Sequence, residues 1–369
     1  MTQLSHGFRI KRGAAIHLLR QVDLLLVLAV VTVVFVLVFD FTSGFHDAAN
    51  IVATVIASRA MTPAQAVAVV GFFEFLGPLL GGTAVANTIG GFVSVSDLPA
   101  AHSVAIVLSG LSGAIAWNLL TWRLGIPSSS SHALVGGLAG AVCVAAGGDH
   151  VVWGFGELLS HGKFTGVTKV LLALLLSPVA GFVIGFLLHR TMSWILRAAR
   201  PAINRHLRMA QFVTSAGLSF AHGANDAQKS MGILTLVLML GGFIPHFAVP
   251  WWVMLACAGT LTLGVISGGW RIVRTLGFSI YRVRPLHALD SQLTAAVVVM
   301  GASLAGAPVS TTHVVTSSIL GIGASEHPRA VRWQTARSIA VTWLITLPGA
   351  AVMAVVVYAL IHAFLPLNP

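Results

Sequence analysis

The sequence predicts an all-α polytopic membrane protein with about 10–12 transmembrane elements. Three features carry this prediction. Asp, Glu, Lys and Arg make up only 8% of the 369 residues, against about 25% in a soluble domain. Hydrophobic residues make up 56%, and the mean hydropathy is +0.91. The apolar residues also form long blocks, unlike the short alternating segments of a β-barrel. So few charges cannot cover a soluble protein of this length, and nearly all of the chain is expected to lie in lipid.

The apolar blocks define the expected elements in chain order. Several are too short to cross about 30 Å of hydrocarbon, and the short ones flank polar interruptions that contain Gly or Pro. An interrupted helix survives in lipid only where protein or a watery cavity surrounds its backbone. We therefore expect interrupted or re-entrant helices, with the functional residues at the interruptions. The blocks span residues 22–41, 51–57, 64–80, 104–122, 133–146, 170–188, 212–220, 233–243, 251–266, 293–304, 314–322 and 339–364.

The basic residues gather at the ends of apolar blocks. A formal net charge of +11 could indicate a nucleic-acid partner, but sixteen of the 21 Lys and Arg residues lie in four clusters beside apolar spans. This placement is typical of positive-inside topology and of contact with anionic lipid headgroups. We expect membrane lipid and no nucleic acid as a partner. The clusters are Arg9, Lys11, Arg12 and Arg20; Arg190, Arg197, Arg200, Arg205 and Arg208; Arg271, Arg274, Arg282 and Arg284; and Arg329, Arg332 and Arg337.

Neither the cysteines nor the N-terminus indicates another class of protein. Cys143 and Cys257 lie in apolar stretches and form neither a disulfide framework nor a metal-site pattern. The apolar run 22–39 is longer than a signal-peptide core, and no small-x-small cleavage site follows it, so it is expected to be the first transmembrane helix. The sequence has no P-loop or metalloprotease motif, so we expect no cofactor and no ATP-driven transport by this chain.

Two motifs repeat in the same order along the chain. Residues 44–48 (GFHDA) resemble residues 223–227 (GANDA) at an offset of 179, and residues 127–132 (PSSSSH) resemble residues 308–313 (PVSTTH) at an offset of 181. Duplicated halves with matching interruptions are typical of secondary transporters, in which the substrate binds near the midplane between inverted repeats. We predict an inverted internal repeat, with a basic tail (1–21), a first half (22–190), a basic connection (191–208) and a second half (209–365).

The two Pro-Ser motifs are candidate anion sites. Proline favours the start of a helix, and the Ser and Thr residues after it can cap that start. A half-helix N-terminus offers free amides, a positive dipole end and hydroxyl donors. Two such cradles from opposite halves would surround one tetrahedral oxyanion. The alternative is that the hydroxyls only join helices by hydrogen bonds.

The two acidic motifs are candidate cation sites. Asp47 and Asp226 are two of only ten acidic residues, and an ionisable group within a membrane span indicates function. A carboxylate would repel a phosphate-like anion unless a cation lay between them. Asp47 with Asn50, and Asn225 with Asp226, supply the oxygen ligands that a small hard cation prefers. A buried Asp can instead carry H⁺, or it can simply cap a helix.

Other polar residues in apolar blocks are weaker candidates. His46 occupies the position that Asn225 holds in the second half, and an imidazole there favours coupling to H⁺ or to a transition metal. Glu74 is the most costly of the others to bury. Gln292, Lys229 and Asn118 either reach the site or have packing roles, and His132 and His313 either brace the half-helices or touch substrate.

These motifs resemble the inorganic phosphate transporter (PiT) family over essentially the whole chain. The resemblance rests on residues 42–57 (TSGFHDAANIVATVIA), 127–137 (PSSSSHALVGG), 219–232 (SFAHGANDAQKSMG) and 308–317 (PVSTTHVVTS). His46 before the first Asp is similar to the bacterial low-affinity branch. Val309 departs from the family pattern, and the segment 241–250 is shorter than the hydrophilic insertion that members of this branch often carry.

The resemblance implies uptake of inorganic phosphate by cation-coupled symport and alternating access in the plasma (inner) membrane. It implies coupling to H⁺ or transport of a divalent metal–phosphate complex in this branch, and to Na⁺ in other members. The implied phosphate ligands are Ser128, Ser129, Ser130, Ser310, Thr311 and Thr312. The implied cation ligands are Asp47, Asn50, Asn225 and Asp226, joined by His46, Glu74 and Gln292 as further candidates.

Three other functions stay open at this point. Some relatives carry sulfate, so a sulfate permease of the same fold is the nearest alternative. An intramembrane enzyme acting on a phosphorylated lipid is disfavoured because one catalytic centre does not need each element twice. A passive anion channel is the third, and the oligomeric state, including a homo-oligomer, is left open.

Overall fold

A computed structural model describes residues 2–268, 281 and 283–365, with side chains described from Leu24 onward. Arg271, Arg274 and Arg282 of the third basic cluster lie outside the described residues. The described part is all-α, with twelve α-helices and no strand. They are α1 (Thr2–Ala57), α2 (Pro63–Leu80), α3 (Ala84–Gly90), α4 (Ala100–Leu124), α5 (Ser130–Ala145), α6 (Phe155–His161), α7 (Gly166–Ile195), α8 (Ile203–Leu240), α9 (Trp251–Ser267), α11 (Pro285–Leu304), α12 (Thr311–Glu326) and α13 (Trp333–Phe364).

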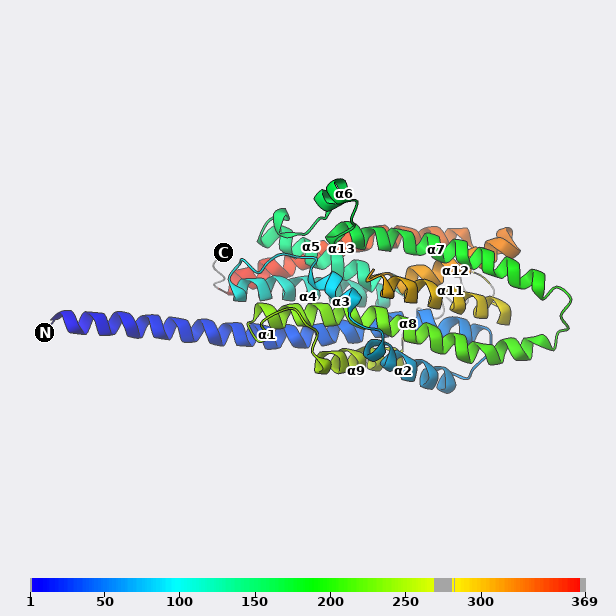
Figure 1. Cartoon of the computed structure of the whole chain (residues 1–369), viewed down its shortest axis with the longest axis horizontal. Helices are drawn as coiled ribbons and strands as arrows, with labels where there is room; N and C mark the ends of the chain where they lie inside the picture. The colour runs from blue at the N-terminus through cyan, green and yellow to red at the C-terminus, as the bar shows by residue number, and fades with distance from the viewer. Residues whose placement is uncertain (1, 269–280, 282, 366–369) are drawn as a thin grey trace.

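The long helices run roughly parallel to one axis and form a single bundle (Figure 1). Five described helices are long and apolar enough to cross a membrane: residues 24–57 of α1, then α2, α4, α7 and α13. Their outward faces carry exposed apolar side chains such as Val30, Leu175 and Leu344. The all-α polytopic class predicted from composition is therefore confirmed.

Two short helices do not cross the bundle. α5 and α12 each have 16 residues, which gives a length of about 24 Å, less than the hydrocarbon thickness. Each follows a short link that contains the first residues of its Pro-Ser motif. The pairs α4–α5 and α11–α12 are therefore helical hairpins. In Figure 1 the two hairpins extend toward opposite ends of the bundle. The predicted interruptions therefore fall at the Pro-Ser motifs, while the inverted repeat stays a prediction from the repeated motifs.

Helices of the two predicted halves are interleaved. α2 packs mainly on α8, and α9 packs in the same way on α1. Likewise α7 packs on α12, and α13 packs on α5 and α4. The contacts between halves come in equivalent pairs, so neither half encloses its own hairpin. This cross-packing brings the two acidic motifs into the same interior.

The acidic motifs differ from the expectation of broken helices, because α1 and α8 continue through them without interruption. Glycine explains how these helices fit. A Cβ added to Gly44 would lie 2.2 Å from the Leu261 carbonyl oxygen of α9, and one added to Gly223 would lie 2.3 Å from the Glu74 carbonyl oxygen of α2. The two glycines therefore permit close helix crossings. The polar side chains of the motifs bond to other elements, so the backbone need not unwind.

The basic clusters do not all lie at the same end of the bundle. Figure 1 places the connection between α7 and α8 at one end and the N-terminus of α1 at the other. The start of α13, with Arg332 and Arg337, lies at the end of the α7–α8 connection. The tail cluster and the central cluster therefore face opposite sides of the membrane, so the positive-inside pattern cannot apply to all four clusters.

The helix crossings predict a difference between glycines. Gly223→Ala and Gly44→Ala should each destabilise the protein by about 1–3 kcal/mol, since backbone must move to admit the methyl group. Gly217→Ala on α8 is the matched control: nothing lies within 4 Å of its added Cβ, and Ala is the better helix former. Thermal unfolding in detergent measures the effect. Equal melting temperatures for all three variants would contradict the packing described.

Candidate functional site

Each hairpin tip is capped by a serine of its own Pro-Ser motif. Ser129 is the N-cap of α5, and its Oγ accepts from the His132 amide at 3.2 Å. Ser310 is the N-cap of α12, and its Oγ accepts from the His313 amide at 3.4 Å. Both hydroxyl hydrogens remain available to an acceptor, and the first amides of a helix have no intrahelical partner. The two tips are therefore built as helix N-terminal donor sites.

The two tips meet in the interior of the bundle. Ser131 Oγ donates to the Val309 carbonyl oxygen at 3.1 Å, which joins the first cradle to the second. The ring centroids of His132 and His313 lie 4.6 Å apart, and those of His313 and Trp343 lie 3.9 Å apart in a tilted arrangement. The two histidines thus brace the tips against each other, as one of the two roles considered for them requires.

Asp47 connects both cradles to α1. Its Oδ2 accepts from Ser130 Oγ at 2.8 Å, and its Oδ1 accepts from Thr312 Oγ1 at 2.9 Å. Asn50 Nδ2 donates to the same Oδ1 at 3.0 Å and to Thr312 Oγ1 at 2.8 Å. One carboxylate therefore receives hydroxyl donors from α5 and α12, which belong to different halves. His46 and Ser128 complete this side, with His46 Nε2 lying 3.3 Å from Ser128 Oγ and Nδ1 lying 3.3 Å from Asp47 Oδ1.

Asn225 has a different role from Asp47. Its amide nitrogen donates to Ser303 Oγ at 2.9 Å and to the Ala307 carbonyl at 3.3 Å, and its Oδ1 accepts from the Val309 amide at 3.3 Å. The side chain therefore holds the link between α11 and α12. The structure places Asn225 at the second cradle, but its amide contacts are to that link, whereas it was expected to be a ligand of a cation.

Asp226 pairs with Lys229, and this pairing was not expected. Lys229 Nζ donates to Asp226 Oδ1 at 2.7 Å and to Ser131 Oγ at 2.6 Å. Both charged side chains are buried, with 3% of each exposed. Of the two roles considered for Lys229, contact with the site and packing, the structure therefore shows contact with the cradle and with Asp226.

His222 is a site residue that the sequence reasoning missed. Its Nδ1 lies 2.5 Å from Glu74 Oε1, and its Nε2 lies 3.6 Å from Asp226 Oδ2. Asp47, His222 and Asp226 each bring a ligand atom within 4.8 Å of the others, a donor set that fits a small cation. Helical spacing could have found His222, because it precedes Asp226 by four residues and so shares its face.

Gln292 and Asn118 lie at the margin of the site. Gln292 Nε2 donates to Thr54 Oγ1 at 3.1 Å, and its Oε1 accepts from Thr214 at 2.6 Å. It thus ties α11 to α1 and α8, and both of its described bonds are to threonine hydroxyls. Asn118 Nδ2 donates to Ser43 Oγ at 3.5 Å on the opposite flank.

Unpaired polar atoms gather at this centre. Asn50 Oδ1, Thr311 Oγ1 and Glu74 Oε2 are all buried without a hydrogen-bond partner. Buried polar groups in proteins are usually satisfied, and exceptions indicate a ligand, an ion or water. The six predicted phosphate residues of the cradles are also buried. The centre is therefore a polar interior closed from both sides.

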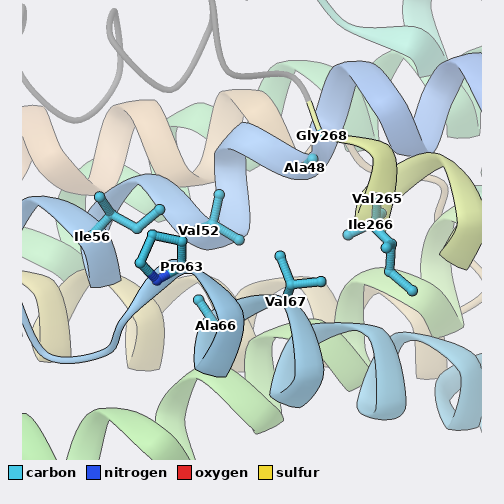
Figure 2. A pocket seen from close by; sticks show the side chains of 9 residues that line it. All are labelled: Ala48, Val52, Ile56, Pro63, Ala66, Val67, Val265, Ile266 and Gly268. Carbon is cyan, nitrogen blue, oxygen red and sulfur yellow. The ribbon is translucent and has the colours of Figure 1, made fainter.

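Another face of α1 beside the acidic motif is apolar. Figure 2 shows Ala48 and Val52 of α1 turned toward Ala66 and Val67 of α2 and Ile266 of α9. They line an apolar crevice of about 10 Å³, which is room for about one water molecule. Polar and apolar faces of one helical turn are thus separated, and phosphate has no place on the apolar one.

The comparisons with known proteins agree with this architecture. Residues 43–354 match the model of the phosphate transporter family. The chain is 40% identical over 344 residues to a probable low-affinity inorganic phosphate transporter of Bacillus subtilis, covering 92% of this chain and 99% of that one. It is 40% identical over 324 residues to a protein of the same description in Rhizobium meliloti, covering 87% and 93%.

A solved structure shares the fold. A chain described as the sodium-dependent phosphate transporter matches with a TM-score of 0.81 and 24% identity, covering 92% of this chain and 100% of that one. At this identity the likeness establishes the fold alone. Fold, buried polar centre and matches together define a multi-pass transporter of the plasma membrane rather than an enzyme. The chain belongs to the phosphate transporter family.

The contact between Glu74 and His222 predicts strong coupling in stability. Each of Glu74→Gln and His222→Gln should destabilise the protein by about 3–5 kcal/mol, because each leaves a buried partner uncompensated. The double variant should lose much less than the sum of the two. Melting temperatures of the purified protein in detergent give the cycle. Additive losses would mean that the two side chains do not interact.

Proposed function

We propose that this protein imports inorganic phosphate by cation-coupled symport, with alternating access around the site between the two hairpin tips. Phosphate binds to the hydroxyls and amides of Ser128, Ser129 and Ser130 on one tip and of Ser310, Thr311 and Thr312 on the other. The coupling ion is H⁺ or a divalent metal carried as its phosphate complex, with Na⁺ as the alternative.

The observation that carries this proposal is the bonding of Asp47 to both cradles. Ser130 and Thr312 each direct a hydroxyl to this carboxylate at 2.8 and 2.9 Å. A proton or cation that neutralises Asp47 weakens the hydrogen bonds between its carboxylate and these hydroxyls. The hydroxyls can then donate to phosphate. Loading of the cation and loading of the anion are thereby coupled through the same donors.

Charge supports a positively charged companion for phosphate. The centre buries the carboxyl groups of Asp47, Glu74 and Asp226, and the ammonium of Lys229 is the lasting positive charge beside them. His46 and His222 can each add one more when protonated. A phosphate dianion entering such a centre is unpaired unless positive charge enters with it, and burying unpaired charge is costly. A neutral metal–phosphate complex or accompanying protons meet this requirement.

The arrangement of the helices supports alternating access. The two tips bond to Asp47 of α1 and to Lys229 of α8, and α12 and α5 pack on the cross-packed α7 and α13. The hairpins extend toward opposite ends of the bundle, so movement of the helices can open the centre to one side of the membrane at a time. Rocking of one hairpin with its packed helices against the other exposes the cradle residues first to one side of the membrane and then to the other.

Phosphate uptake into proteoliposomes tests the proposed function. We expect accumulation of ³²P-phosphate that follows an imposed pH gradient or added Mg²⁺, with each gradient varied separately from Na⁺. Uptake that persists unchanged when all ion gradients are collapsed would indicate a channel. Uptake of ³⁵S-sulfate that excess phosphate does not reduce would indicate the sulfate permease.

Asp47→Asn and Asp226→Asn should each lower phosphate uptake by about 10- to 100-fold, because each loses charged hydrogen bonds worth about 1.5–3 kcal/mol apiece. Both variants should still insert in the membrane. Asp97→Asn is the matched control, since this carboxyl is 64% exposed and contacts only His150 among the described ion pairs. Uptake at the wild-type rate in both site variants would refute the role given to these carboxylates.

A further inference from the structure

The two acidic motifs differ at one charged position. The repeat that aligns Asp47 with Asp226 also aligns Asn50 with Lys229, each three residues after its Asp. Both side chains are buried, with 1% and 2% of their surfaces exposed. The duplicated site thus carries a neutral amide in the first half and an ammonium in the second.

The two positions make equivalent contacts across the halves. Asn50 bonds to its own Asp and to Thr312 on the tip of the second half. Lys229 bonds to its own Asp and to Ser131 on the tip of the first half. Thr312 and Ser131 are themselves equivalent in the Pro-Ser repeat. The difference between amide and ammonium therefore lies within otherwise matched surroundings.

Lys229 Nζ is held by three oxygen atoms. Asp226 Oδ1 lies at 2.7 Å, Ser131 Oγ at 2.6 Å and the Val309 carbonyl oxygen at 3.1 Å. Carboxylate, hydroxyl and carbonyl oxygens are the ligands that proteins offer to small hard cations. The ammonium is a compact point charge, so it fills this position in the way that a bound cation would.

Asn50 supplies no positive charge at the corresponding position of the first half. Its amide nitrogen makes both of its bonds, to Asp47 and Thr312, while its Oδ1 is buried without a partner. A buried carbonyl oxygen without a donor is costly. This oxygen and the Asp47 carboxylate together offer ligands to an added positive charge, which the second half already contains.

We propose that Lys229 is a tethered counter-ion that permanently occupies one of two equivalent cation positions. The exchangeable positive charge of each cycle then enters only on the side of the centre formed by Asp47 and Asn50. This inference rests on the proposed symport, and it specifies one coupling charge at the repeat site and not two. Entry of a second cation at Asp226 is opposed by repulsion from an ammonium already in contact with the same oxygens.

Lys229→Asn tests the inference, because it places in the second half the residue that the first half has. In proteoliposomes, the wild type should show a Hill coefficient of about 1 for the cation that drives uptake. The Lys229→Asn variant should show a coefficient approaching about 2, since both positions must now be filled from solution. An unchanged coefficient and an unchanged cation dependence in an active variant would overturn the inference.

A binding measurement decides the case in which the variant does not transport. The melting temperature of purified Lys229→Asn in detergent should rise when NaCl replaces choline chloride at fixed pH, or when the pH is lowered. Either rise should exceed that of the wild type, because a cation that binds the folded state stabilises it. Lys229→Met has a side chain of similar length without charge or oxygen, and it should show no such gain. A gain equal to that of wild type in Lys229→Asn would also overturn the inference.

One further variant and the wild type separate this inference from the proposed function. Lys163→Asn makes the same change on the exposed segment after α6 and should leave the Hill coefficient at the wild-type value. If wild type takes up no phosphate under any gradient, the proposed symport fails. The melting measurements on Lys229→Asn and Lys229→Met still report whether the lysine replaces a cation.

Discussion

The structure depends on one carboxylate, that of Asp47, which accepts hydrogen bonds from hydroxyls on both hairpin tips. Asp47 lies on a long continuous helix, yet its two oxygens bond to Ser130 and Thr312, which stand at the starts of short helices from different halves. In a low-dielectric interior, such charge-assisted bonds are strong, and their loss leaves several polar groups unsatisfied together. The position of each tip is therefore tied to the state of this one group, and the tips can respond to its neutralisation.

The same constraint explains why the surrounding helices are interleaved. Polar side chains are costly in lipid unless other protein groups satisfy them, and a single half cannot enclose its own hairpin. α2 and α9 exchange places between the halves, and the contacts at Gly44 and Gly223 allow them to approach closely. This exchange supplies Glu74 to His222 from the opposite half. Enclosure of the polar centre and assembly of its ion pairs are thus achieved by the same packing.

The two acidic motifs have equivalent positions at which their residues differ. A duplicated unit begins with two equivalent positions, and each can then change without loss of the other. When the two motifs are aligned, His46 occupies the position of Asn225, and Asn50 occupies the position of Lys229. The second half has become the fixed side, in which Asn225 holds the α11–α12 link and Lys229 neutralises Asp226. The first half keeps the unpaired amide oxygen and the carboxylate shared by both tips, which are the groups suited to an exchangeable charge.

The sequence by itself determined that the chain is helical and lies in the membrane, and its repeated motifs predicted two equivalent halves and the residues that carry the chemistry. Composition, apolar block length and repeated motifs are properties of nearby residues, and Asp47, Asn50 and the hydroxyls of both cradles were found in this way. Only the tertiary structure decided that α1 and α8 run unbroken, that His222 meets Glu74, and that Lys229 reaches Ser131. These contacts join residues 148 and 98 positions apart, and helix packing, which no local pattern encodes, sets which of them meet.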